Sequence, residues 1–124
     1  MKRIYYAHAI CLYGSGEELR ELRTIQRRLP RHEVINPADY QNDPRKRRDT
    51  IGFCLRLVEK SDVVVFSRLL GKVTAGVGKE LNHGLKIGKP VFELAASKLV
   101  GRTRPVKFIS RQATIELYRK WRAL

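Results

Sequence analysis

Short apolar runs alternate along the chain with segments whose apolar residues recur at helical spacing. Four of the runs have the length and the β-branched or aromatic content of strands. They are Arg3–His8, Glu33–Asn36, Val63–Phe66 and Val91–Leu94. Val63–Phe66 is apolar at every position, which is typical of a central parallel strand buried on both faces. Pro105–Ile109 is a weaker fifth strand, and the basic stretch 95–104 before it is predicted to be irregular.

Four segments carry the helical pattern. Ser15 and Glu18 form the Ser-x-x-Glu capping box that starts a helix, and Pro30 ends it. Further helices are predicted over about 45–60, from Gly76 to a stop at Gly88, and onward from the cap residue Ser110. The expected buried faces are Leu19, Leu22, Ile25 and Leu29; Ile51, Cys54, Leu55 and Val58; Val77, Leu81, Gly84 and Leu85; and Ile115, Tyr118 and Trp121 or Arg122.

The order of these elements predicts a single domain over residues 1–124. Strands that alternate with helices form a parallel sheet covered on both faces. We therefore expect an α/β, flavodoxin-like three-layer fold with a four- to five-stranded parallel sheet in the order 2-1-3-4-5. That order places a ligand crevice at the carboxyl ends of the first and third strands. The loops 9–16 and 67–75 would form the lips of this crevice.

The composition is that of a globular protein with an excess of positive charge. Hydrophobic residues make up 43% and charged residues 31% of the 124 residues, and the net charge is +14. This charge favours anionic partners, namely nucleotides, nucleic acid or an acidic protein. The alternatives are a role in solubility or the charge-rich surface of a thermophile.

The sequence favours a cytoplasmic location. No apolar run approaches the roughly 20 residues of a membrane span, so no membrane association is expected. The N-terminus MKRIYYAHAI is interpreted as a strand rather than a signal peptide. Cys11 and Cys54 lack metal-ligand spacing, which predicts free thiols, and neither a metal nor a cofactor is expected.

The stretch Gly76–Phe92, GVGKELNHGLKIGKPVF, holds the strongest chemical candidate. Glu80 is placed by the pattern in the first turn of a helix, where N–H groups and the helix dipole favour an ionised carboxylate. A nucleophile must be ionised, and the glycines Gly76 and Gly78 would let a ligand approach the backbone. The alternative is that Glu80 only satisfies free N–H groups at the helix start.

The segment GVGKELNHGLKIGKPV resembles the nucleoside 2-deoxyribosyltransferases and the 2′-deoxynucleoside 5′-monophosphate N-glycosidases. In that superfamily a small-residue turn, Gly-x-x-x-Glu, a helix and Gly-Lys-Pro-Val follow in this order. IYYAHAI, VINPAD and KSDVVVF extend the resemblance over roughly residues 3–94, but only the Gly76–Val91 part is specific.

The resemblance implies a role for several residues. Glu80 would be the nucleophile that attacks the anomeric carbon of the sugar, with Tyr5 close to it. Gly76, Gly78 and Asn82 would belong to the substrate-binding segment, although the family usually has Gly at the position of Asn82. The implied activity is N-glycosidic bond cleavage or deoxyribosyl transfer on a nucleoside or nucleotide, in a homodimer or larger assembly.

The chain also departs from the family. Where the family has Gly-Ser or Gly-Pro after the first strand, this chain has His8 and Ala9. The loop Tyr13, Gly14, Ser15 and Gly16 could supply N–H groups and a hydroxyl to a phosphate instead, or could be an ordinary turn before a capped helix.

A family aspartate on the second helix aligns with Cys54, whose apolar surroundings in the sequence favour a core role. The group that protonates or holds the departing base is therefore open among His8, Asp43 and Asp49. His8 is the best placed of the three, since it ends the first strand and titrates near neutrality.

A basic run, Arg45–Arg48, opens the second predicted helix, where cations oppose the helix dipole. It could bind phosphate or nucleic acid, or be a solvated surface. A looser basic cluster contains Arg102, Arg104, Lys107 and Arg111. The alternative to an enzyme is therefore a non-catalytic relative that binds a nucleotide or nucleic acid through a basic surface, and a third possibility is an NAD-glycohydrolase-like module.

Overall fold

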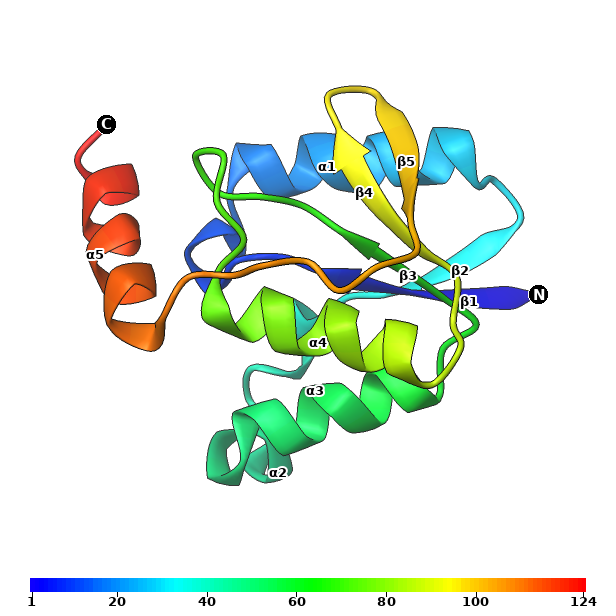
Figure 1. Ribbon diagram of the computed structural model, residues 1–124, viewed down its shortest axis with the longest axis horizontal. Coiled ribbons are helices and arrows are strands. Elements are labelled where there is room, and N and C mark those ends of the chain that lie inside the picture. Colours follow the sequence, from blue (N-terminus) through cyan, green and yellow to red (C-terminus); the bar gives the residue numbers. More distant parts are fainter.

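The computed structural model, which describes residues 1–124, contains one five-stranded sheet in the order β2-β1-β3-β4-β5 (Figure 1). Its strands are β1 (Lys2–Ala7), β2 (His32–Ile35), β3 (Val63–Phe66), β4 (Val91–Ala95) and β5 (Lys98–Arg102). The first four strands pair in parallel, whereas β5 is antiparallel to β4. The α/β class, the strand order and a mostly parallel sheet are thus confirmed, whereas the fifth strand of the expected parallel sheet is antiparallel instead.

The edge strand β5 forms because the chain reverses within two residues after β4. Ala95 pairs with Lys98, and Ala96 adopts a positive φ of 56° in the turn between them. Tight hairpins need such left-handed backbone. Since β5 occupies the free edge of β4, the segment 105–109 has no strand to pair with, and the prediction of a strand there is wrong. It runs instead as an extended strap.

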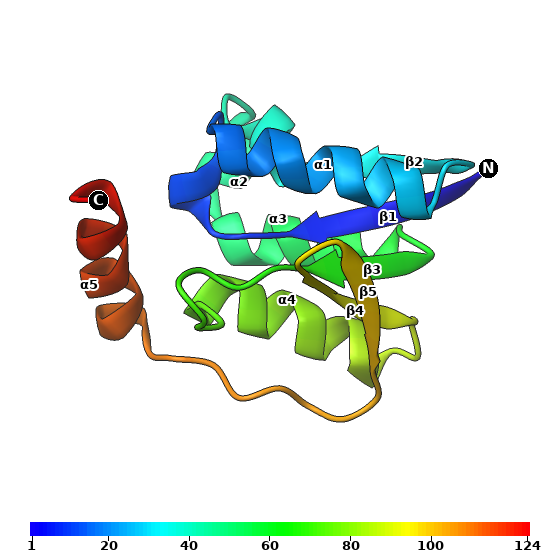
Figure 2. The same ribbon diagram turned by 90° about the horizontal axis from the view of Figure 1, so that it is seen from above.

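Helices cover both faces of the sheet, and one more lies beyond its end (Figures 1 and 2). They are α1 (Gly16–Arg28), α2 (Pro44–Arg48), α3 (Thr50–Glu59), α4 (Ala75–Lys86) and α5 (Arg111–Arg122), with the short 3-10 turns η1 (Ile10–Leu12) and η2 (Pro37–Tyr40). α1 packs on one face through Ile25, and α3 and α4 pack on the other through Val58 and Leu81. None of these helices has the length and apolar character that crossing a bilayer requires.

The predicted helix over 45–60 is two helices, because Asp49 interrupts it. Asp49 has φ −149° and ψ 83°, and its carboxylate accepts a hydrogen bond of 3.0 Å from the Gly52 N–H. The side chain therefore competes with the continuing backbone ladder and caps α3 instead. Asp43 caps α2 in the same way through the Arg45 N–H. In α1 the predicted cap is present, with Ser15 Oγ accepting from the Glu18 N–H, but the Glu18 carboxylate accepts from the Gly14 N–H rather than from Ser15, so the capping box is only half formed. Leu19 is exposed rather than buried.

α4 begins at Ala75, with Thr74 at its N-cap, and ends as predicted before Gly88. Gly88 has φ +80°, and this turn lets the Lys89 N–H donate to the Gly84 carbonyl. One of the carbonyl groups in the last turn of the helix thereby gains a hydrogen-bond partner. The early start places Glu80 beyond the first turn of α4. The prediction that Glu80 lies in the first turn is therefore wrong.

The strap, residues 103–110, carries the chain along α4 to α5 (Figures 1 and 2). Asn82 holds it with two hydrogen bonds to Val106, one from the N–H at 2.8 Å and one to the carbonyl at 2.9 Å. Ile109 N–H bonds to the Val73 carbonyl at 3.0 Å. Trp121 and its neighbours on α5 then pack against the loop that follows β1. The strap and α5 thus close the sheet at its carboxyl edge.

Candidate functional site

A pocket of about 390 Å³ lies at the carboxyl edge of the sheet, where β1 and β3 end. His8 and Tyr13 follow β1, Thr74 follows β3, and Glu80 comes from α4. Sheet topology places a ligand crevice at this edge in doubly wound folds. The remaining wall comes from α3 and α5, so the pocket is assembled from distant parts of the chain.

Glu80 lies in this pocket with only 7% of its surface exposed. The Tyr5 hydroxyl donates a hydrogen bond of 3.0 Å to Glu80 Oε1. Burial raises the pKa of Glu80 to about 7, and the Tyr5 hydroxyl, the Lys46 ammonium and the Cys54 thiol oppose that rise. The expectation that a helix start keeps this carboxylate ionised is thus not met, because desolvation outweighs the groups that stabilise its charge.

Tyr5 and Cys54 flank the carboxylate. Burial and then the charge of Glu80 raise the pKa of Tyr5 well above its usual value, so its hydroxyl remains a donor. Burial also raises the pKa of the Cys54 thiol to about 11. Cys54 belongs to the core as the sequence indicated, and it also lines the pocket. At neutral pH a thiol with this pKa is uncharged, so Cys54 cannot replace the charge of the family aspartate.

His8 lines the pocket, but both of its ring nitrogens have partners in the protein. Nε2 lies 2.7 Å from Glu18 Oε2, and Nδ1 lies 3.1 Å from the Tyr6 carbonyl oxygen. The ring also stacks on Tyr6 with centroids 3.7 Å apart. Burial lowers the pKa of His8. Both partners are acceptors, and a neutral imidazole donates from only one nitrogen, so the ring donates to one of them while the other lies against its second nitrogen. With both nitrogens facing protein atoms, the geometry favours a positioning role over direct proton transfer.

The loop predicted to bind phosphate contributes Tyr13 alone to the pocket. Gly14 N–H donates to Glu18 Oε1 at 3.1 Å, and Ser15 N–H donates to the Leu12 carbonyl at 3.0 Å. The Ser15 hydroxyl is used in capping α1. Gly16 begins α1 and does not line the pocket. The polar groups of Gly14 and Ser15 are therefore already occupied within the chain.

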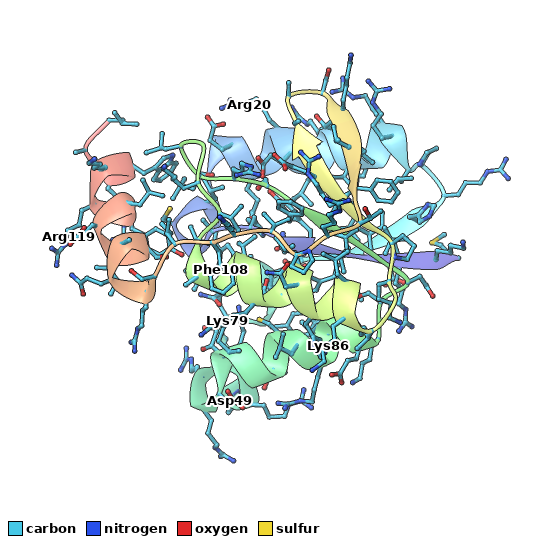
Figure 3. The ribbon with its side chains drawn as sticks, viewed as in Figure 1. Arg20, Asp49, Lys79, Lys86, Phe108 and Arg119 are labelled. Carbon is cyan, nitrogen blue, oxygen red and sulfur yellow. The ribbon has the colours of Figure 1, made fainter.

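Of the three α4 residues predicted to bind substrate, one lies in the pocket and two contact the strap. Gly76 lines the pocket beside Glu80. Gly78 faces the strap, on which Figure 3 shows Phe108, and a Cβ added at Gly78 would overlap the Phe108 side chain. Asn82 holds Val106 of the strap. Gly78 and Asn82 thus fix the strap over α4, and the structure gives them no place in the pocket.

The other two open candidates for the proton donor are helix caps. Asp43 bonds to the N–H and the guanidinium of Arg45, which lower its pKa to about 2. Asp49 caps α3 through Gly52. Neither aspartate lines the pocket. An acid with such a low pKa also has no proton to give near neutrality.

Sequence reasoning did not single out Lys46. Its side chain is buried, its ammonium donates to the Pro37 carbonyl at 2.8 Å and to Gln41 Oε1, and it lies 5.0 Å from the centroid of the Tyr13 ring. It is also the cation that lowers the pKa of Glu80. In the sequence, Lys46 is one of four consecutive basic residues, and nothing there distinguishes the single buried one.

The residues from α5 were also missed as pocket residues. Arg111, Thr114 and Tyr118 line the pocket, and Lys79 on α4 joins them. Thr114 Oγ1 accepts from the Ala75 N–H at 3.0 Å, and the Tyr118 hydroxyl accepts from the Ile10 N–H at 3.3 Å. These bonds tie α5 to the start of α4 and to the loop after β1. Only the path of the strap brings them there, and no local pattern encodes that path.

A scan against protein-family models matches none, and a search of curated proteins finds no significant match. The chemistry of the pocket must therefore be argued from its own groups. They are a buried carboxyl group with a pKa of about 7, the Tyr5 hydroxyl bonded to it, two further tyrosines, Tyr13 and Tyr118, and two cations, Lys79 and Arg111. Such a set can attack or stabilise an electron-poor carbon and can hold an anionic ligand.

Proposed function

We propose that this protein cleaves or transfers at the N-glycosidic bond of a nucleoside or nucleotide, with Glu80 as the nucleophile. The observation that carries the proposal is the Glu80 carboxyl group, buried in a pocket of about 390 Å³ and oriented by a 3.0 Å hydrogen bond from Tyr5. The pocket volume falls within the range of small-molecule sites. The resemblance of the Gly76–Val91 segment to the nucleoside 2-deoxyribosyltransferases supports the same reading.

The proposed reaction has two displacements at the anomeric carbon. Ionised Glu80 attacks C1′, the C1′–N bond breaks, and its electron pair leaves with the base, which takes up a proton. Water or an acceptor base then attacks C1′ and releases Glu80, as in retaining glycosidases. Tyr5 holds one carboxylate oxygen through its hydrogen bond, and the other oxygen would attack the sugar.

Tyr13 is the group we assign to the departing base. It lines the same pocket, and burial followed by the charge of Glu80 raises its pKa. A phenol with a raised pKa stays protonated, so it can donate a hydrogen bond to a ring nitrogen or oxygen of the base. The Lys46 ammonium lies over the face of the Tyr13 ring, 5.0 Å from its centroid, and helps to hold it in place. This assignment replaces His8, whose nitrogens are engaged elsewhere.

The cations Lys79 and Arg111 favour a phosphorylated substrate over a bare nucleoside. Both line the pocket, and both are exposed enough to meet a charged ligand. They come from α4 and α5, so the phosphate would lie between these helices. An Arg–phosphate contact is strong because the guanidinium donates two parallel hydrogen bonds.

Chromatographic measurement of free-base release tests the proposal. The protein is incubated with deoxynucleosides, ribonucleosides, their 5′-monophosphates and NAD, with and without a second base as acceptor. We expect base release from a 2′-deoxynucleoside 5′-monophosphate, and transfer if an acceptor base enters. Release of nicotinamide from NAD, with no release from the other compounds, would favour an NAD-glycohydrolase-like module instead. No release from any of them would contradict the enzyme proposal.

A further inference from the structure

A second cavity, of about 280 Å³, lies along α3 and shares no lining residue with the Glu80 pocket. We call it the α3 groove and define it by four cations, Arg3, Arg45, Arg56 and Lys60, and by the rings of Tyr40 and Phe53 beneath them. These residues come from β1, η2, α2, α3 and the C-cap of α3, Lys60. The groove therefore runs between α3 and the side of the sheet that carries β1 and β2.

Positive charge converges on the α3 groove, and no acidic residue lines it. Arg45 is paired with Asp43, and Arg3 lies 3.7 Å from Glu33. Arg56 and Lys60 have no acidic partner in the structure, and like charges four residues apart on a helix repel. The helix dipole accounts for cations near the end of α3 but not for Arg3 and Arg45, which reach the same groove from other elements.

The floor of the α3 groove is aromatic. Tyr40 is half-buried, and its ring lies 5.5 Å from that of Phe53 at an angle of 58°. The Arg45 guanidinium lies 5.6 Å from the centroid of the Phe53 ring. An aromatic ring on which a base can stack, beside cations that follow a phosphate backbone, is the arrangement by which proteins bind single-stranded nucleic acid.

The positive surface continues from the groove onto α2. This five-residue helix exposes Arg47 and Arg48 as well as Arg45, while Lys46 turns inward. Arg45 is paired with Asp43, and Arg47 donates to the Gln41 carbonyl and Asn42 Oδ1, whereas Arg48 has no partner within the chain. An extended anion that passes from the α3 groove over α2 would meet Arg47 and Arg48 as well as the groove cations, which a single phosphate could not do.

We propose that the α3 groove binds single-stranded nucleic acid, with its phosphates on the four cations and one base on Tyr40. This inference does not depend on the chemistry of Glu80, because the two cavities have separate walls. The strand would lie along α3, and α2 would contact the nucleotides that leave the groove.

Fluorescence anisotropy with a labelled oligodeoxythymidylate of about twelve nucleotides tests the proposal, since known single-strand sites span about 4–16 nucleotides. The dissociation constant is measured between about 50 and 200 mM salt for the wild type and for the double variant Arg56→Gln/Lys60→Gln. The matched control is Arg119→Gln/Lys120→Gln, which removes the same charge from the outer side of α5, where Figure 3 shows Arg119 pointing away from the chain.

Three results are expected. The wild type binds with an affinity that falls as salt rises. In the groove variant the plot of the log of the association constant against log salt becomes less steep by about 1.4, which is about 0.7 for each of two lost phosphate contacts. The α5 control leaves that slope unchanged. Tyr40→Leu weakens binding by about fivefold or more, whereas Tyr40→Phe, which keeps the ring, does not.

Equal loss of binding in the groove variant and the α5 control would overturn the proposal, because it would show attraction by net charge alone. So would absence of binding by the wild type, or tighter binding of a duplex of the same length. Thermal unfolding of each variant separates loss of the site from loss of the fold.

Discussion

The Tyr5 hydroxyl donates a 3.0 Å hydrogen bond to Glu80 Oε1 although the two residues are 75 positions apart in the chain. This contact joins the first strand of the sheet to the helix that carries the proposed nucleophile. It also lowers the pKa of a carboxyl group that burial raises. The balance between these two effects decides how much of Glu80 is ionised at neutral pH.

Tyr5→Phe removes this hydrogen bond and keeps the ring in the core. We expect the pKa of Glu80 to rise by about one unit above its value of about 7, since a hydrogen bond to a charged group is worth about 1.5–3 kcal/mol and part of it is replaced by water. The acid limb of kcat/KM against pH reports this pKa in the free enzyme. An unchanged limb would show that Tyr5 does not act on Glu80.

Lys46→Met removes the buried cation that favours ionised Glu80, so the pKa of Glu80 should rise. Carboxyl-carbon NMR titration of the protein without substrate measures it directly and needs no activity. Lys79→Met is the matched control, because Lys79 lines the pocket but is exposed to solvent, which screens its charge. Equal shifts in both variants would contradict a special role for Lys46.

Glu80→Gln should stabilise the fold at alkaline pH. The pKa of Glu80 in the folded protein, about 7, lies above its usual 4.5, so wild-type stability is lost as pH rises from about 4.5 through 7. Glutamine does not titrate. The free energy of unfolding of the variant, minus that of the wild type, should therefore grow by up to about 3 kcal/mol between pH 4 and pH 8.

Denaturant unfolding at several pH values measures this difference. A constant difference across the range would mean that Glu80 titrates in the folded protein as it does in water. The result does not depend on the substrate, so it tests the electrostatics of the pocket separately from its chemistry.

Gly78→Ala should loosen the strap, because the added methyl group overlaps the Phe108 ring. Overpacking costs about 1–3 kcal/mol, which exceeds the roughly 1 kcal/mol that alanine gains over glycine in a helix. Gly76→Ala is the control, since its Cβ meets only Ile51 at 3.9 Å and should stabilise α4. Hydrogen exchange at Ile109 N–H, which bonds to Val73, should speed up in the first variant only.

The sequence predicts the sheet order and the placement of Glu80 at the carboxyl edge of the sheet, because both follow from the alternation of strand and helix patterns. Four strands, the stop at Gly88 and the cap at Ser110 follow from apolar periods and from residues with fixed backbone preferences. β5 was missed because it depends on a two-residue reversal at Ala96, where no glycine or asparagine marks the turn. The break at Asp49 depends on one side chain that caps α3 rather than extending α2.

The rest of the pocket depends on contacts between distant residues. Burial of Lys46, the engagement of both His8 nitrogens and the arrival of α5 over Glu80 follow from packing. Single-residue patterns do not encode these contacts. The prediction that Glu80 is held ionised is wrong for the same reason. The helix dipole can be inferred from local sequence, whereas desolvation depends on what the fold packs around the carboxyl group.

Covalent capture of the sugar on Glu80 is the most direct test of the account. The protein is mixed with a 2′-deoxynucleoside 5′-monophosphate, quenched in acid within one turnover and digested for mass spectrometry, while base release is followed in parallel. We predict that the peptide containing Glu80 carries 2-deoxyribose 5-phosphate, joined through C1′ to the Glu80 carboxylate as an ester. We also predict a loss of base release of about 10³-fold or more in Glu80→Ala, or about 4 kcal/mol of barrier. Base release at the wild-type rate by Glu80→Ala, with no adduct on this peptide, would contradict it.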